Sequence, residues 1–161
     1  MIVVTVGTQL PFDRLIKMVD ELAPSLGQDV FAQTGVGRYT PQNHPWSANI
    51  EASQFDEKLK NCSVMVSHAG IGTVLKAYKY AKPIILVPRR ASLGEHRNDH
   101  QLATVSQLRS RAGIYVAETK EELQDLLRSD LRPAIAESDV EESRAKLRFY
   151  VRKTVLEMMA S

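Results

Sequence analysis

The chain has 161 residues, of which 43% are apolar, and its 21 basic and 19 acidic side chains give a formal net charge of +2. This length predicts one domain with a core that folds without disulfides. A single cysteine, Cys62, excludes an internal disulfide and a cysteine-rich zinc site. The balanced charge argues against a nucleic-acid-binding protein. No apolar run approaches the ~20 residues that cross a bilayer, and the first residues lack the basic flank of a signal peptide, so we expect a cytoplasmic protein.

Short apolar runs alternate with helical patterns along the first 128 residues. The predicted elements in chain order are a strand at 2–6, a helix at 12–22, a strand at 29–33, a polar loop at 36–47, a weak strand at 48–52, a helix at 54–61, a strand at 63–67, a helix at 74–81, a strand at 83–87, a helix at 97–111, a strand at 114–116 and a helix at 120–128. Repeated strand–helix–strand units predict an α/β fold, a doubly wound, Rossmann-like parallel sheet with helices on both faces.

A change in composition suggests a boundary near residue 130. Pro133 and small residues interrupt the pattern, and an amphipathic helix is predicted over 139–160. We therefore divide the chain into a ligand-binding α/β domain at 1–130 and this final helix. Two alternatives stay open for the helix: it packs on its own domain with a solvated basic face, or it reaches a partner or anionic lipid.

Ligands of open parallel sheets bind beyond the carboxyl ends of the strands, where the strand order reverses. Gly7-Thr8-Gln9 follows the first predicted strand, and His68–Thr73 follows the fourth. In the second stretch, Gly70 and Gly72 let backbone approach a ligand, and the following helix offers free N–H groups that suit a phosphate. A tight turn in any doubly wound sheet has the same appearance. Dinucleotide-binding glycines, by contrast, follow the first strand.

A dense polar run follows the fifth strand. It contains Arg89, Arg90, Glu95, His96, Arg97, Asn98, Asp99, His100 and Gln101. Side chains of these types bind the hydroxyls of a polyol in pairs, and the alternatives are a solvated loop or a zinc site made by His96 and His100. His44, in the proline-flanked loop, is expected at the surface.

Three stretches together resemble one known family. They are Ser67–Thr73, Lys82–Pro88 and Asn98–Gln101, and they are similar to the carboxy-terminal, donor-binding domain of glycosyltransferase family 28. The stretch 6–15 resembles the small catalytic subunit of the eukaryotic dolichol-linked N-acetylglucosaminyltransferase. The stretch 88–101 resembles small subunits of bacterial exopolysaccharide and capsule glycosyltransferases.

The resemblance implies one C-terminal half of a GT-B fold, in a chain with no room for the acceptor-binding half. That half is then expected on a membrane-anchored partner subunit, in a heterodimer that uses a UDP-sugar donor and a lipid-linked saccharide acceptor. The chain itself is expected at the cytoplasmic face of the membrane, recruited by the partner.

The resemblance also implies a set of donor-binding residues. The residues expected at the diphosphate, nucleotide and sugar are Gly7, Thr8, Gln9, Thr34, Phe55, His68, Gly70, Gly72, Thr73, Arg89, Asn98, His100 and Gln101. One position departs from the family, because Lys76 stands where a carboxylate binds the ribose; we predict that Glu95 supplies the missing acceptor. Arg89 and Arg90 suit either an acidic sugar or the diphosphate.

The reaction implied is an inverting sugar transfer in polysaccharide biosynthesis, without a metal or cofactor, in which helix dipole and donors stabilise the leaving UDP. The general base is unassigned. His68 is a candidate for it, although the same side chain can simply brace its turn. Two alternatives remain: a non-catalytic nucleotide-binding module that stimulates a partner transferase, and an unrelated phosphate-binding α/β domain.

Overall fold

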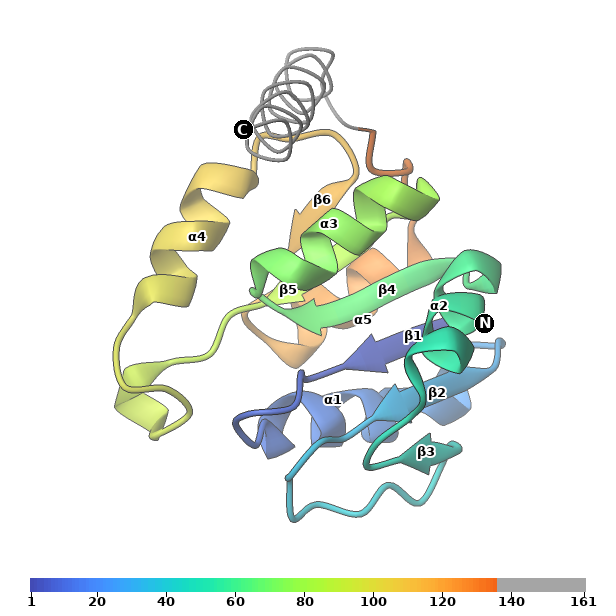
Figure 1. Ribbon diagram of the computed structural model, residues 1–161, viewed down its shortest axis with the longest axis horizontal. Helices are drawn as coiled ribbons and strands as arrows, with labels where there is room; N and C mark the ends of the chain where they lie inside the picture. The colour runs from blue at the N-terminus through green and yellow to red at the C-terminus, as the bar shows by residue number, and fades with distance from the viewer. Residues whose placement is uncertain (136–161) are drawn as a thin grey trace, which may run out of the picture.

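The computed structural model describes residues 1–135 (Figure 1). The elements of this part are β1 (Ile2–Thr5), α1 (Asp13–Leu22), η1 (Ala23–Ser25), β2 (Val30–Gln33), β3 (Trp46–Ser47), α2 (Ala52–Asn61), β4 (Val64–His68), α3 (Ile71–Tyr80), β5 (Ile84–Val87), η2 (Ala91–Leu93), α4 (His100–Leu108), β6 (Ile114–Val116) and α5 (Lys120–Arg128). The predicted helix at 139–160, and with it the second predicted domain, lies outside the described residues.

The strands form one parallel sheet in the order β3-β2-β1-β4-β5-β6. The chain starts in the middle, builds outward to β3, and then returns past β1 to build the other half. The helices α2 and α3 lie in front of the sheet in Figure 1, with α1 and α5 behind it. The predicted doubly wound α/β fold is therefore confirmed, with its strand order reversing between β1 and β4.

The core is divided by the sheet into two apolar layers. Along β1, Val4 joins the layer under α1 and α5, whereas Val3 joins the layer under α2, α3 and α4. Every residue of β1 and β5 is buried. Burial on both faces explains why these strands appear in the sequence as continuous apolar runs without alternation.

Two predicted elements were placed wrongly. The third strand is not 48–52 but the two residues of β3, which pair with the end of β2; the Ala32 and Thr34 amides donate to the carbonyls of Pro45 and Ser47 at 3.1 and 3.0 Å. The helix predicted at 97–111 is the shorter α4. Its N-terminal extension fails because Asp99 Oδ1 accepts the Ala91 amide at 3.0 Å, which folds the preceding segment into a loop.

The polar loop between β2 and β3 is held to α1 by hydrogen bonds to one buried carboxylate. Asp20 of α1 is 1% exposed, and its carboxylate accepts the Gln42 and Asn43 amides and the Tyr39 hydroxyl. The surface prediction for His44 is consequently wrong: its side chain is 2% exposed, and its Nε2 lies 3.8 Å from Asp20 Oδ1.

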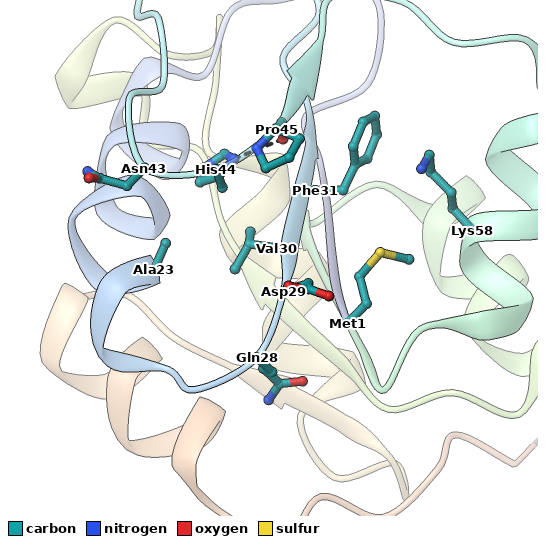
Figure 2. Close-up of a pocket in the computed structure, with 10 residues that line it drawn as sticks. All are labelled: Met1, Ala23, Gln28, Asp29, Val30, Phe31, Asn43, His44, Pro45 and Lys58. Carbon is teal, nitrogen blue, oxygen red and sulfur yellow. Dashed lines mark hydrogen bonds between the residues drawn. The ribbon is translucent and has the colours of Figure 1, made fainter.

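His44 also borders a hollow along β2, the strand next to the edge strand β3. Figure 2 shows Phe31 and Lys58 on one side of this strand, with Asn43, His44 and Ala23 on the other. The hollow begins at the amino-terminal end of β2, since Gln28 and Asp29 also line it. None of the residues predicted to bind a donor borders it.

The described chain ends against the amino-terminal edge of the sheet. Ala134 is fully buried, and its amide donates to the Lys82 carbonyl just before β5 at 3.2 Å. Gly113 makes room for it, because a Cβ at that position would overlap the backbone of Ala134. Within residues 1–135, no helix is both long enough and apolar enough to span a bilayer.

Candidate functional site

A cleft of about 380 Å³ lies where the strand order reverses. Thr5, Gln33 and His68 reach it from the last residues of β1, β2 and β4, whose arrowheads in Figure 1 point to the same edge of the sheet. The first turn of α3 closes one side and the start of α2 another. Open parallel sheets bind their ligands in this place.

The cleft brings together seven of the predicted donor-binding residues. They are Gly7, Thr8, Phe55, His68, Gly70, Gly72 and Thr73. Five further residues line it: Thr5, Gln33, Ile50, Ala52 and Lys76. Gln33 is the final residue of a predicted strand and Thr5 the last but one of another, and these positions near strand ends were a signal that they face a ligand.

The amino-terminal end of α3 forms one side of the cleft. Gly70 is its N-cap, and no side chain caps the helix. The amides of Ile71 and Gly72 make no hydrogen bond within the described part of the chain. Gly72 lines the cleft, and a Cβ at that position would meet nothing within 4 Å, so this turn borders open space. Free amides at a helix end, with open space before them, form an anion-binding arrangement.

Hydroxyl groups support this turn from below. Ser67 Oγ donates to Thr73 Oγ1 at 3.0 Å, and both side chains are buried. Thr5 Oγ1, at the end of β1, donates to Gln33 Oε1 at 2.9 Å. These bonds connect α3 to β4 and β1 to β2, and they fix the strand ends that surround the cleft.

The imidazole of His68 fills the space between two glycines. A Cβ at Gly7 would lie 3.0 Å from His68 Cε1, and a Cβ at Gly70 would overlap Nε2. Burial, together with the positive charge of Arg89, lowers the pKa of His68 to about 4. The ring is therefore neutral at pH 7, so it offers one donor and one acceptor but accepts a proton weakly.

An ion pair stands at the mouth of the cleft, at the position where the family resemblance implies a carboxylate. Lys76 of α3 forms a short ion pair with Asp56 of α2, and its Nζ lies 5.2 Å from the centre of the Phe55 ring. The hydrogen bond from Lys76 lowers the pKa of Asp56 to about 2. Sequence reasoning missed Asp56, because it lies 20 residues before Lys76 on another helix.

Gln101 connects the two strand ends beside the cleft. Its Oε1 accepts the amides of Ala69 and Arg89 at 3.2 and 3.0 Å, and the side chain is buried. These two bonds fix the amide orientation, so Nε2 is free to donate in the other direction. Gln101 does not itself line the cleft, and Asn98 and His100 next to it are exposed.

The remaining predicted residues do not reach the cleft. Thr34 is buried and Gln9 is exposed. Glu95 uses its carboxylate internally: it accepts Arg14 Nε and Nη2 at 2.7 and 3.0 Å and the Arg90 amide at 2.9 Å. Both oxygens are thus occupied, and the geometry gives no support to Glu95 as the ribose acceptor.

Neither arginine after β5 projects freely into solvent. Arg89 is 4% exposed, and Arg90 pairs with Glu118 at 2.8 Å.

The alternative of a zinc site at His96 and His100 gains no third ligand, because no group of three His, Cys, Asp or Glu side chains in residues 1–135 is arranged to hold a metal.

Solved structures similar to this chain are glycosyltransferases that are more than twice as long. They include SsfS6 of Streptomyces sp. SF2575, complexed with thymidine diphosphate (TM-score 0.57, 18% identity), the calicheamicin glycosyltransferase CalG4 (0.52, 16%) and the glycosyltransferase of kitacinnamycin (0.52, 15%). The likeness covers 80, 78 and 79% of this chain but 33, 33 and 35% of those chains. No curated protein matches.

The likeness identifies the fold as that of the C-terminal half of GT-B glycosyltransferases. A family model described as the glycosyltransferase family 28 C-terminal domain matches residues 1–154, nearly the whole sequence. The chain belongs to this family.

Proposed function

We propose that this chain is the donor-binding, catalytic subunit of an inverting glycosyltransferase, which transfers a sugar from a UDP-sugar to a lipid-linked acceptor. A membrane-anchored partner subunit supplies the acceptor site. The observation that carries the proposal is the open amino-terminal end of α3, where the Ile71 and Gly72 amides have no partner in residues 1–135. A diphosphate placed there gains hydrogen bonds and the positive end of the helix dipole.

The same contacts favour the departure of UDP. The leaving diphosphate gains negative charge as the glycosidic bond breaks, and preorganised amides stabilise that charge more than they stabilise the intact donor. His68 adds a neutral ring donor at the edge of the same turn. Thr73 also lines the cleft, and its hydroxyl, which accepts from Ser67, keeps its own proton to donate.

The wall made by Ile50, Ala52 and Phe55 suits the nucleoside end of the donor. It presents apolar surface and one aromatic ring to a flat base. Thymidine diphosphate, which is bound in SsfS6, has the same pyrimidine-and-diphosphate build as UDP. Its presence in a protein of similar fold supports a pyrimidine nucleotide in this cleft.

The sugar is assigned to the amino-terminal end of α4. Gln101 Nε2 is a donor of fixed direction there, and the exposed side chains of Asn98 and His100 stand beside it. Amide and imidazole groups of this kind both donate to and accept from hydroxyls. The arrangement supports a hydroxyl-rich ligand without distinguishing one hexose from another.

A partner is proposed because the carboxyl edge of the sheet carries apolar side chains at the surface. Val36, Ile71 and Leu93 are 59, 60 and 57% exposed, and they follow β2, β4 and β5. In the glycosyltransferases of similar fold, about two thirds of each chain lies outside the part that this chain matches. A second protein that covers this edge would bury these residues and bring the acceptor, and the general base, to the cleft.

A second candidate, the non-catalytic nucleotide-binding module, is favoured by one observation. No carboxylate lines the described cleft, and its only imidazole has a pKa of about 4. Residues 1–135 therefore place no general base for neutral pH in the cleft, and a non-catalytic module does not require a general base.

Calorimetry with purified chain tests the shared claim. We expect UDP to bind and to raise the melting temperature, with ADP and GDP weaker; no binding of any nucleoside diphosphate would refute the proposed site. Transfer from labelled UDP-sugars is then measured with membranes from the source organism, with and without the chain. If the chain is the catalytic subunit, sugar transfer appears only when the chain is added, and Gln101→Ala abolishes it. If the chain is a stimulating module, the membranes transfer sugar without it, and this basal transfer is unchanged by Gln101→Ala.

A further inference from the structure

Arg89 carries a buried positive charge that forms no ion pair with the described residues, although the charge of Glu95 partly opposes the effect of burial on its pKa. It follows β5 at the carboxyl edge of the sheet and is 4% exposed. No carboxylate of residues 1–135 forms an ion pair with it, and its Nε is buried without a hydrogen-bond partner. Burial lowers the pKa of this guanidinium. An unpaired buried charge is unfavourable, so the fold keeps it against a free-energy cost.

The guanidinium closes the loop that borders the cleft. Nη2 donates to the Val6 carbonyl at 2.8 Å and to the Leu10 carbonyl at 2.7 Å. These two carbonyls flank the three residues 7–9, of which Gly7 and Thr8 line the cleft. The guanidinium carbon also lies 4.9 Å from the centre of the buried Phe12 ring. One side chain therefore sets the shape of the loop on the β1 side of the site.

Its charge is also felt inside the cleft. The positive charge of Arg89 contributes to the lowered pKa of His68, whose ring lines the cleft. The neighbouring arginines differ in this respect, because Arg14 is paired with Glu95 and Arg90 with Glu118. Of these three arginines, Arg89 is the one that forms no ion pair within residues 1–135, so its charge is only partly balanced, by Glu95.

We propose that Arg89 is a positioning residue for the donor, which holds the 7–9 loop in shape and whose unpaired charge is balanced by the diphosphate bound in the cleft. This inference rests on the proposed function and explains why an arginine predicted to touch the donor is buried instead. The diphosphate then completes an electrostatic arrangement that the unliganded chain leaves incomplete, without any direct contact from Arg89.

The test compares ligands that differ in charge. Uridine, UMP and UDP share one nucleoside and carry no, one and two phosphates. Their dissociation constants are measured by calorimetry for the wild type, Arg89→Met, Arg89→Lys and Arg90→Met, with folding checked by circular dichroism. Arg90→Met is the matched control, since it removes an adjacent arginine that already has a carboxylate partner.

We expect Arg89→Met to lower the UDP-over-uridine affinity ratio by about tenfold or more, with UMP between them. Arg89→Lys, which keeps the charge, retains most of that ratio, and Arg90→Met changes UDP affinity by no more than about twofold. The proposal is overturned if a folded Arg89→Met binds UDP like wild type, or loses uridine and UDP affinity equally.

Two further results keep the outcomes separate. If Arg89→Met does not fold, Arg89→Lys decides: loss of the wild-type ratio in that variant contradicts the charge-balancing role. If the wild type itself binds no member of the series, the proposed function fails, and with it the premise of this inference.

Discussion

Replacing Gly72 with alanine should change stability and ligand binding in opposite directions. Gly72 is the second residue of α3, and a Cβ there would meet no protein atom within 4 Å. Alanine is favoured over glycine in a helix by about 0.5–1 kcal/mol. The unliganded variant should therefore melt about 1–4 °C higher than the wild type.

The added methyl group occupies the space in front of the free amides, where we place the diphosphate. Loss or distortion of one hydrogen bond to a charged group costs about 1.5–3 kcal/mol, which corresponds to about a 10- to 100-fold weaker binding of UDP. Uridine, which lacks phosphate, should bind both proteins alike. Calorimetry gives the affinities, and differential scanning fluorimetry gives the melting temperatures.

Gly70→Ala provides the contrast on the same turn. Its Cβ would overlap His68 Nε2, so this variant should melt lower than the wild type rather than higher. The reasoning is refuted if Gly72→Ala raises the melting temperature and binds UDP with wild-type affinity. In that case α3 begins with a tight turn and not with a phosphate site.

Three further predictions concern other parts of the structure. Gln101→Glu keeps an acceptor for the Ala69 and Arg89 amides, so it should retain wild-type stability but lose the preference for a UDP-sugar over UDP. Gln101→Ala should lose that preference and also about 1–3 kcal/mol of the free energy of unfolding, measured with urea. The pKa of His68 is about 4 in the folded chain and about 6.5 in the unfolded chain. The contribution of His68 to the free energy of unfolding is therefore complete above pH 6.5 and is lost as the pH falls toward 4. Between pH 7 and 5 the free energy of unfolding should fall by about 2 kcal/mol more in the wild type than in His68→Gln, and equal losses would contradict this. Asp20→Ala leaves two loop amides without their acceptor and should cost about 3 kcal/mol, while Glu21→Ala, which alters an exposed neighbour on the same helix, should change unfolding little.

The fold was predictable because its signals are local. Buried strands such as Ile84–Val87 appear as apolar runs, and helices such as α5 repeat their apolar residues at helical spacing. The two-residue strand β3 has no such signal, because its place is set by pairing with Ala32 and Gln33. His44 was misplaced for a similar reason, since Asp20 lies 24 residues earlier.

The site was predictable in position more than in detail. Strand ends and the glycine turn indicated the edge of the sheet at which the cleft lies. The direction of each polar side chain in the run 89–101 depends on distant partners, and Glu95 turns toward Arg14, which is 81 residues away. A polar residue in a loop looks the same in the sequence whether it faces a ligand or holds the loop together.

The anchoring of Ala134 has a practical consequence for experiments on this protein. Its position next to Lys82 and Gly113 places the end of the described chain at the edge of the sheet opposite the cleft. A substitution at this anchor therefore tests the amino-terminal edge of the sheet separately from the cleft. At Gly113, where φ is +78°, any side chain would displace Ala134, so Gly113→Val should loosen this attachment and leave the opposite side unaltered.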